Sequence, residues 1–364
     1  MQEKKKIYYV AELNLPNKSA YSIHVMKMCE AFSKLKYDTN LFVINIKNIK
    51  VISKIYNISN KFKIISIFSN FILLNFILRI IFSFRILSKK LDQNALFISR
   101  SIIFALFASL FKKKVILELH HEITGISKII YLLFKSLNLI KNLKFIFLNS
   151  SLNHIYKIKK KNYIVLDDAV NLGDFKYKNK SKFKKTCVYI GSFFEGKGIE
   201  QIFSLAKKNR EIFFHIYGDK KNLKLNKKRK NIKIFNYINY SKIPKILSKY
   251  DVALMPYQKK VRGRGSIWLQ KYMSPLKMFD YMAARMVILA TKLKVYNHIL
   301  KNNFNCMLID INDDDRWSKA IRSAFKKNKK NKYLKLNAYQ TAKKYTWDRR
   351  CQRIIQFSKK ISIK

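Results

Sequence analysis

The stretch CVYIGSFFEGKGIEQIFSLAKK (187–208) reads as a buried strand, a glycine-bearing loop and an amphipathic helix. Gly191, Gly196 and Gly198 allow the tight backbone turns that such a loop needs. Lys197 stands just before the helix, where a cation and free backbone N–H groups can converge on a phosphate. The loop follows neither the Walker pattern nor G-x-G-x-x-G, so by itself it also fits an ordinary lysine in a flexible turn.

The alternation of strand and helix continues in both directions from this stretch. Apolar runs without strict alternation are typical of parallel strands that are covered on both faces. The first series of such runs is KIYYVAEL (6–13), NLFVINI (40–46), ALFISR (95–100), VILELHH (115–121) and KFIFLNS (144–150). The second series is YIVLDD (163–168), CVYIGS (187–192), IFFHIYGD (212–219), IKIFNYI (232–238), VALMPY (252–257), MVILAT (286–291) and CMLID (306–310). Helical stretches fall between the runs, so the sequence predicts an α/β chain with two Rossmann-like, doubly wound domains.

The length of 364 residues suits two domains, and 49% hydrophobic residues can fill two cores. Polar, lysine-rich connectors occupy the region near 160–180. We therefore place an N-terminal domain at 1–165, a C-terminal domain at 166–346 and a closing helix at 347–364. In such sheets ligands bind beyond the carboxyl ends of the strands, so we expect the site on loops that face a cleft between the domains.

Cysteine use and the start of the chain bear on its compartment. Cys29, Cys187, Cys306 and Cys351 are widely spaced without a CxxC pair, which argues against a disulfide framework or a zinc site. The start, MQEKKKIYYVAEL, carries an apolar run too short for a signal peptide. These observations predict a cytoplasmic protein.

The net charge of +55 raises the question of nucleic acid. The excess is mostly lysine, with thirteen arginines, and it is spread along the chain instead of being concentrated in one motif. We therefore expect no specific nucleic-acid partner, and an RNA- or DNA-binding protein stays as an alternative that rests on charge alone. A basic surface also suits anionic lipid headgroups.

The stretch FSNFILLNFILRIIFSFRIL (68–87) is long enough to span a membrane. Arg79 near its centre costs roughly 2.5–3.5 kcal/mol, and Arg85, Asn70 and Asn75 remove much of the remaining apolar gain. A spanning helix is thus disfavoured. A domain-packing helix and an interfacial helix both stay open.

Two loops that follow the early strands carry candidate binding groups. Ser19 is expected to cap a helix that begins near Ala20, and such an N-terminus can hold an anion or simply be an ordinary capped turn. His120 and His121 follow a strand without metal-ligand spacing. We expect His120 to hydrogen-bond a substrate hydroxyl.

The segment VALMPYQKKVRGRGSIWLQKYMSPLKMFDYMAA (252–284) carries the second group of candidates. Arg262 and Arg264 lie in a flexible, cationic Gly–Arg cluster, and Ser274–Pro275 predicts an N-cap followed by a first-turn proline. Lys277 and Asp280 share a helix face. They fit either an ion pair worth roughly 0.2–0.5 kcal/mol or a lysine for a diphosphate with an acid for ribose hydroxyls.

Taken together and in order, these motifs resemble the retaining glycosyltransferases of the GT-B fold, specifically glycosyltransferase family 4. The resemblance rests on SAYSIHVMKMCEAF, ISRS, VILELHHE, YIGSFFEGKGIEQI, FHIYGD, YDVALMPY, SPLKMFDYMAA and YTWDRRCQRIIQF, and it runs almost end to end. It implies two Rossmann-like domains facing a cleft, with a C-terminal helix that returns to the first domain. It also implies a nucleotide-diphosphate-sugar donor, a glycan or lipid-linked acceptor, and neither a metal nor a cofactor.

The resemblance also implies roles for single residues. Lys197 falls on the phosphate-binding lysine, Asp280 on the ribose-binding second acid of E-x7-E, and His120 on the histidine of the catalytic loop. Ser19 and Ala20 fall on the loop that approaches the donor diphosphate and the acceptor. The remaining substrate-binding positions are Gly191, Ser192, Gly218, Arg262, Arg264, Ser274, Pro275, Leu276 and Lys277.

The sequence departs from the family pattern at several positions. Ser192 stands where an arginine is frequent, Tyr272 where the first acid belongs, and Arg285 and Val287 where Gly and Pro are usual. Arg262, Arg264 or Lys277 could supply the missing positive charge. We expect a retaining transferase that builds a surface polysaccharide or lipid-linked glycan, peripheral on the inner face of the plasma membrane. A catalytically impaired GT-B-like nucleotide-binding subunit is the alternative.

Overall fold

The computed structural model describes residues 5–59, 61–70, 75–141, 143–176, 183, 185–223, 229–263 and 267–359. Its contacts divide the chain into two compact units: residues 1–167 with 347–364 form unit 1, and residues 168–346 form unit 2. The first boundary lies two residues beyond the one placed from the sequence.

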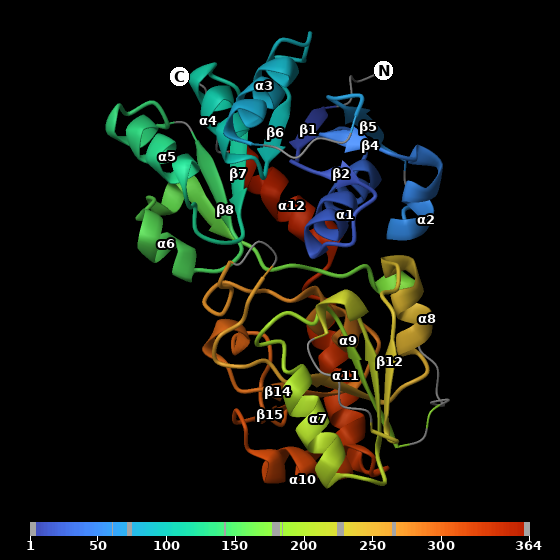
Figure 1. Ribbon diagram of the computed structural model, residues 1–364. Helices are drawn as coiled ribbons and strands as arrows, with labels where there is room; N and C mark the ends of the chain where they lie inside the picture. The colour runs from blue at the N-terminus through green and yellow to red at the C-terminus, as the bar shows by residue number, and fades with distance from the viewer. Residues whose placement is uncertain are drawn as a thin grey trace. The chain divides into compact units, whose positions relative to one another are not determined.

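Unit 1 is built on a seven-stranded parallel sheet of order β5-β3-β1-β6-β7-β8-β9 (Figure 1). Its strands are β1 (Lys6–Val10), β3 (Asp38–Val43), β5 (Lys63–Ser66), β6 (Leu96–Ser99), β7 (Val115–Leu119), β8 (Lys144–Phe147) and β9 (Tyr163–Val165), and β2 (Asn14–Leu15) pairs separately with β4 (Asn45–Ile46). The apolar runs form strands because covered strands bury both faces. The run YIVLDD, counted above with the second series, provides β9 at the edge of this first sheet.

Helices cover the faces of the unit 1 sheet. They are α1 (Ala20–Lys34), α2 (Ile52–Tyr56), α3 (Phe76–Leu87), α4 (Ile102–Leu110), α5 (Ile126–Ser136), α6 (Ser151–Tyr156) and α12 (Trp347–Ser358). Helix α12 packs along α1, and its residues Cys351 and Ile354 are fully buried (Figure 1). The closing helix thus completes the core of the unit that begins the chain.

The stretch 68–87 contains α3, a helix of 12 residues, and residues 71–74 lie outside the described part of the chain. Phe82, Ser83 and Ile86 are buried, whereas Ile77 and Phe84 are exposed. Across the described residues, no helix combines the length and the apolar character that crossing a bilayer requires. One face of α3 therefore packs into the unit and another is left exposed.

Unit 2 repeats the plan with a six-stranded parallel sheet of order β12-β11-β10-β13-β14-β15. The strands are β10 (Thr186–Ile190), β11 (Phe213–Tyr217), β12 (Ile232–Phe235), β13 (Val252–Met255), β14 (Val287–Thr291) and β15 (Met307–Ile309). The helices are α7 (Ile199–Lys208), α8 (Ile243–Leu247), α9 (Leu276–Ala283), α10 (Asp314–Ala324) and α11 (Lys329–Ala342). The predicted fold class, two doubly wound α/β units, is confirmed.

Candidate functional site

Lys197 lies in the loop between β10 and α7. Its neighbour Gly198 has a backbone conformation that favours glycine. Gly198 precedes α7 in a left-handed conformation with φ +82°, and a Cβ there would collide with the carbonyl oxygen of Pro256. The side chain of Lys197 points its Nζ toward Tyr257, 5.2 Å from the ring centroid. Burial lowers the pKa of Lys197 from 10.5 to about 8.

A second lysine reaches the same place from the first turn of α9. The Nζ of Lys277 lies 3.6 Å from the ring centroid of Tyr189 and 5.3 Å from that of Tyr257. Gly191 makes room for it, since a Cβ at Gly191 would lie 2.5 Å from that Nζ. Burial, and then the charge of Lys197, hold the pKa of Lys277 well below its usual value.

The two ammonium groups therefore share one aromatic wall beyond the carboxyl end of β10. The Nζ of Lys277 is buried and has no hydrogen-bond partner among the described residues. A buried polar group normally finds a partner, so this nitrogen is a ready donor for an anion. The structure brings together Lys197, Lys277 and Gly191, three of the residues predicted from the sequence.

Asp280 lies further along α9 and is 3% exposed. Its Oδ1 accepts a hydrogen bond from the hydroxyl of Tyr240 at 3.1 Å. No ion pair with Lys277 forms, although the charge of Asp280 acts to raise the pKa of that lysine. The simple ion-pair interpretation of Lys277 and Asp280 is therefore wrong, and the ribose role of Asp280 stays a prediction.

The predicted helix start is also wrong by one residue. Helix α9 begins at Leu276 with Pro275 in the N-cap position, and no side chain caps it. Ser274 is not the cap because its hydroxyl instead accepts a hydrogen bond from the backbone N–H of Asp168 at 3.1 Å. The first turn of α9 thus keeps backbone N–H groups without a side-chain cap.

The other predicted residues of unit 2 lie on neighbouring loops. Gly218 packs so closely on the carbonyl of Gly191 that a side chain would clash there, and the carbonyl of Ser192 accepts a hydrogen bond from Tyr189 at 2.8 Å. Arg262 pairs with Glu195 at 3.4 Å, and this exposed ion pair partly neutralises its charge. Arg264 lies outside the described residues.

Arg285 closes α9 from a left-handed position. Its φ is +53°, its N–H donates to the carbonyl of Met282 at 3.1 Å, and the N–H of Met286 donates to that of Tyr281 at 3.2 Å. These two bonds form a Schellman motif, in which glycine is usual at the position of Arg285. The guanidinium lies 4.0 Å from the ring centroid of Tyr339, a cation–π contact that offsets part of the backbone cost.

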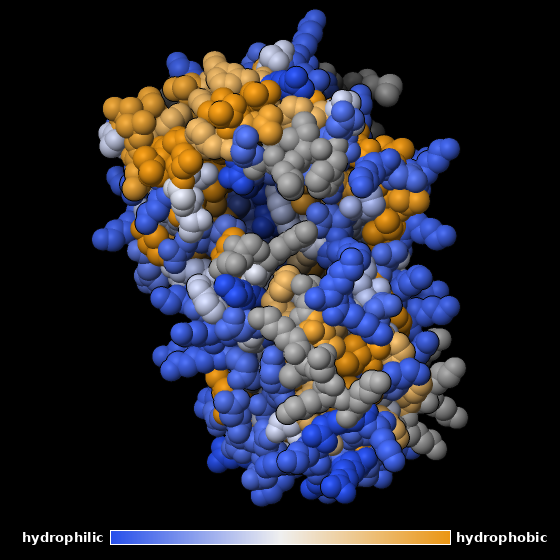
Figure 2. Space-filling view, in the orientation of Figure 1, coloured by the Kyte–Doolittle hydropathy of each residue, from blue (hydrophilic) through white to orange (hydrophobic). Residues whose placement is uncertain are grey.

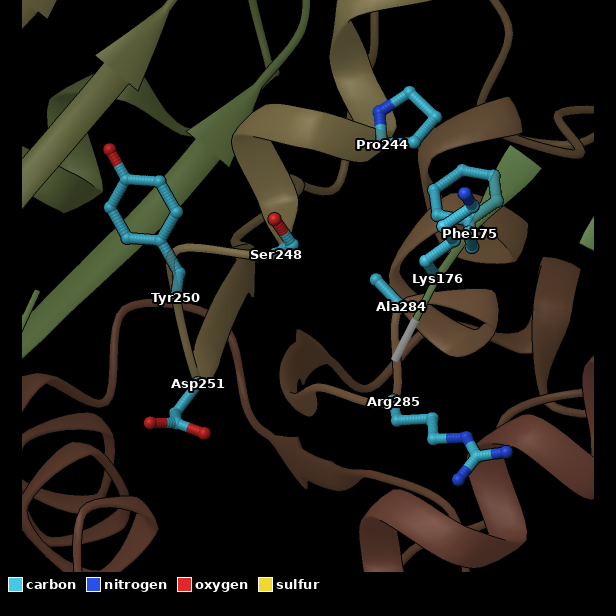
Figure 3. Close-up of a pocket in the computed structure, with 8 residues that line it drawn as sticks. All are labelled: Phe175, Lys176, Pro244, Ser248, Tyr250, Asp251, Ala284 and Arg285. Atoms are coloured by element: carbon cyan, nitrogen blue, oxygen red, sulfur yellow. The ribbon is translucent and has the colours of Figure 1, made fainter. Parts of the chain in front are cut away.

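A pocket beside Arg285 lies at the C-terminal end of α9 (Figure 3). It is lined by Phe175, Lys176, Pro244, Ser248, Tyr250, Asp251, Ala284 and Arg285. Asp251 directly precedes β13, so the pocket lies at the amino end of that strand, whereas ligands of such sheets bind at the carboxyl ends. Arg285, a departure from the family pattern, therefore affects the C-terminal end of α9 and not the end of the sheet where ligands bind.

The effect of a left-handed arginine at the end of α9 on the free energy of unfolding can be measured. We expect Arg285→Gly to leave the free energy of unfolding within about 1 kcal/mol of wild type, since relief of the left-handed conformation offsets the lost contact with Tyr339. Arg285→Ala loses the contact and keeps the strain, so it should be about 1 kcal/mol less stable than Arg285→Gly. Urea unfolding of both variants tests this, and equal stabilities would contradict it.

In unit 1, a buried carboxylate gathers side chains from several elements. Glu118 of β7 is 2% exposed. Its Oε2 accepts from the hydroxyl of Tyr9 at 2.8 Å, and its Oε1 lies 2.8 Å from the Nε2 atoms of His24 and His120 and 2.5 Å from Nη2 of Arg350. Despite burial, His24 and Arg350 hold the pKa of Glu118 well below its usual value.

This carboxylate determines which ring nitrogen of His120 carries the proton. Burial, and then the charge of Arg100, lower the pKa of His120 to about 3, so its ring is neutral near pH 7. A neutral ring facing an ionised carboxylate carries its proton on Nε2, as the 2.8 Å contact with Glu118 requires. Nδ1 of His120 is then the acceptor, suited to a hydroxyl.

The neutral state of His120 gives a pH dependence. The pKa of His120 in the folded protein, about 3, lies below the ordinary 6.5. The contribution of the neutral ring to the free energy of unfolding is therefore complete above pH 6.5 and is lost progressively as the pH falls toward 3. Between pH 7 and pH 5 we expect a loss of about 2 kcal/mol of unfolding free energy. His120→Gln should flatten that slope, and the matched change at exposed His154 should not. Urea unfolding across this range decides, and an unchanged slope in His120→Gln would contradict it.

Other polar groups line the same ends of β1, β6 and β7. Ser19 caps α1 as predicted, since its hydroxyl accepts from the N–H of Ser22 at 3.2 Å, and Ala20 opens that helix. The guanidinium of Arg100 lies 3.9 Å from the ring centroid of Tyr21, and burial, with a smaller contribution from the charge of Arg100, lowers the pKa of His121. Nη1 of Arg100 has no hydrogen-bond partner among the described residues.

One group of possible metal ligands is found in the described part of the chain. It consists of His24, Glu118 and His120, whose ligand atoms lie within 4.8 Å of one another. The set is a poor fit for a cation. Arg350 already places a positive charge 2.5 Å from the oxygen that would bind the metal. The residues therefore favour an ion-paired carboxylate over a metal centre.

Several residues of both sites were missed from the sequence. Glu118 lies inside an apolar strand run, and its partner Arg350 is 232 residues away, so no local pattern joins them. Tyr189 and Tyr257 are inconspicuous in a chain with 21 tyrosines. The acid within VILEL was the available signal, because a buried strand seldom carries a charge without a partner.

Comparisons with known proteins extend these findings. Residues 174–341 match the family Glycosyl transferases group 1. No curated protein sequence matches the chain. Together with the structural matches that follow, the domain match supports a glycosyltransferase.

Solved structures match the chain from end to end. A glycosyltransferase of Rickettsia africae has a TM-score of 0.73 at 14% identity and covers 99% of each chain. HepE of Anabaena, in complex with UDP and glucose, has a TM-score of 0.70 at 11% identity over 97% of this chain and 98% of its own. A variant of S. aureus TarM with fondaparinux, alpha-GlcNAc-glycerol and UDP has a TM-score of 0.71 at 13% identity over 98% and 100%. These likenesses show the GT-B fold.

Proposed function

We propose that the chain transfers a sugar from a nucleotide-diphosphate sugar to a glycan or lipid-linked acceptor, with retention of the anomeric configuration. The observation that carries this is the pair Lys197 and Lys277, which share the wall of Tyr257 beyond the carboxyl end of a parallel strand. Two cations with an unpaired buried nitrogen are suited to a diphosphate. The pair lies in the part of the chain that matches group 1 glycosyl transferases.

In this proposal unit 2 binds the donor. The two ammonium groups and the uncapped first turn of α9 stabilise the charge that develops on the departing diphosphate, and no metal or cofactor takes part. Asp280 accepts hydrogen bonds from ribose hydroxyls. Gly191, Gly218 and Ser192 keep the backbone close to the ligand, and Pro275 and Leu276 begin the helix that points at it. UDP and glucose in HepE, and UDP in TarM, support a donor of this class.

Residues of unit 1 bind the acceptor in this proposal. Nδ1 of His120 accepts a hydrogen bond from a substrate hydroxyl other than the one that attacks, and Ser19 and Ala20 present the N-terminus of α1. No carboxylate is assigned as a covalent nucleophile, so the diphosphate itself takes the proton as the hydroxyl attacks from the same face. The bond from the anomeric carbon to the acceptor oxygen forms as the bond to the diphosphate oxygen breaks.

The biological role proposed is the synthesis of a surface polysaccharide or lipid-linked glycan. The protein would work in the cytoplasm, at the inner face of the plasma membrane. The glycan ligands held by TarM support an acceptor of this kind. The anomeric configuration of a transfer product, read by NMR, tests retention separately from transfer.

One screen tests the central proposal. The purified chain is titrated calorimetrically with UDP, GDP and ADP and with sugars of each, and hydrolysis of the sugars is followed in parallel. We expect micromolar-range binding of one nucleotide series and slow hydrolysis of its sugar. Failure to bind any nucleotide diphosphate would overturn the proposal.

A second candidate is a nucleotide-binding subunit without turnover. Tyr272 stands at the position of the first acid and offers no carboxylate there. Its side chain is 5% exposed. Arg262 cannot fully replace a missing charge while it pairs with Glu195. Tight nucleotide binding without transfer to any acceptor in a glycolipid panel would favour this candidate.

A further inference from the structure

Helices α3, α4 and α5 expose large apolar side chains on one region of unit 1. Ile129 is 67% exposed and Ile77 is 65% exposed, values typical of polar residues. The exposed apolar residues there are Ile77, Ile81, Phe84, Leu110, Phe111, Ile126, Ile129, Leu132, Leu133, Leu137 and Leu139. Figure 2 shows the corresponding surface as a broad hydrophobic area over these helices, and we name it the apolar face.

The apolar face is one continuous surface. The ring centroids of Phe84 on α3 and Phe107 on α4 are 4.9 Å apart, and those of Phe107 and Phe134 on α5 are 6.0 Å apart. Phe111 extends the row, 6.4 Å from Phe84. A continuous apolar surface of this kind marks an interaction site, whereas single exposed side chains need no explanation.

The helices that form the apolar face carry basic residues and no acidic ones. Residues 76–87, 102–114 and 126–141, which contain the three helices and the segments that follow α4 and α5, include no Asp or Glu. They include Arg79, which pairs with Glu12 at 3.3 Å, and the basic residues Arg85, Lys112, Lys113, Lys114, Lys128, Lys135 and Lys141. An apolar surface edged by cations matches the acyl chains and anionic headgroups of a bilayer.

We propose that the apolar face docks on an anionic lipid bilayer, with its Ile, Leu and Phe side chains at the acyl boundary and its lysines among the headgroups. A second copy of the chain fits this face less well, because a two-fold contact would bring the same lysines against one another. This inference deepens the proposed function. Docking on the bilayer does not depend on that function, whereas the identification of the acceptor as a membrane lipid rests on it.

The test is flotation of the full chain with vesicles. We expect the protein to float with vesicles of phosphatidylcholine and phosphatidylglycerol and to float at least about tenfold less with phosphatidylcholine alone. The triple variant Ile129→Ser, Leu132→Ser, Leu133→Ser should lose binding by about tenfold or more. So should Lys112→Glu with Lys128→Glu, because each basic residue near the surface contributes to attraction.

Matched variants in unit 2 control for general changes in surface character. Phe304, Tyr333 and Leu336 are each at least 47% exposed, and replacing all three with Ser should leave flotation unchanged. Lys329→Glu with Lys330→Glu is the matched charge control on the N-terminal turn of α11.

Three results would overturn the inference. They are no flotation of the wild type with anionic vesicles, equal flotation of the triple serine variant and its control, or a dimer in ultracentrifugation that only the triple serine variant dissociates. Calorimetric binding of UDP, GDP and ADP in the absence of lipid is measured in parallel. A variant that keeps nucleotide binding but loses flotation separates this surface from the proposed donor site.

Discussion

Lys197→Ala and Lys277→Ala are each expected to lower the rate of sugar transfer by about 10²–10³-fold, the range seen when one preorganised donor to a developing anion is removed. Both nitrogens lie on the face of Tyr257, and that of Lys277 has no partner among the described residues. Because negative charge grows on the leaving diphosphate, kcat should fall more than KM rises.

The two lysines should not act independently. The charge of Lys197 lowers the pKa of Lys277, so removing either one makes the other easier to keep protonated. The double variant should therefore lose more than the product of the single losses, because no lysine remains to compensate. Nucleotide affinity of the wild type should also weaken above about pH 8, as Lys197 loses its proton.

Lys233→Ala is the matched control, because its Nζ lies 5.3 Å from the ring centroid of Phe235 in the same unit. It should leave kcat and KM unchanged. Steady-state assays with the nucleotide sugar identified by the screen provide the measurement. A loss below threefold in both single variants would remove the diphosphate role from this pair.

Glu118→Gln is expected to lower the free energy of unfolding by about 3–5 kcal/mol, since it leaves the Arg350 guanidinium buried without its counter-charge. His24 and His120 lose the same ionised partner. Urea unfolding followed by tryptophan fluorescence suits the measurement, because Trp347 lies 5.2 Å from His24, between ring centroids, and reports on this cluster.

A paired replacement distinguishes charge from packing. Glu118→Leu with Arg350→Met removes both ions and should recover most of the lost stability, as apolar substitutes for buried ion pairs commonly do. The same double variant should still lower kcat, because His120 no longer has a partner that fixes its proton on Nε2. Exposed Glu200→Gln is the control. Recovery of neither stability nor folding would point to packing instead of charge as the role of Glu118.

Much of the fold could be predicted from the sequence, and the reasons are local. Runs such as VILEL and MVILAT are short and have no polar alternation, which is typical of strands covered on both faces, and the helical stretches between them favour a parallel order. The start of α9 was missed by one residue because Ser274 had a stronger use for its hydroxyl, on the N–H of Asp168 more than a hundred residues earlier. Capping rules see only neighbours in sequence.

The candidate sites divide in the same way. Lys197, Lys277 and Gly191 were predicted because the motifs that carry them occur in the order of a known family, although each loop pattern alone also fits an ordinary turn. Glu118 and Arg350 could not, since their contact depends on α12 returning to the first sheet. The aromatic walls at Tyr189 and Tyr257 likewise depend on side-chain directions that appear only once the strands are assembled.

The return of α12 has a consequence for biosynthesis. Unit 2 is a continuous segment, residues 168–346, whose two ends are joined by a bridge between Val170 and Thr346, so its fold needs no residue from outside that segment. Unit 1 does, because α1 lacks its covering helix until residues 347–358 have been made. The first-synthesised part of the chain thus waits for one of the last-synthesised helices, and in that interval α1 is a nascent surface that chaperones are expected to recognise.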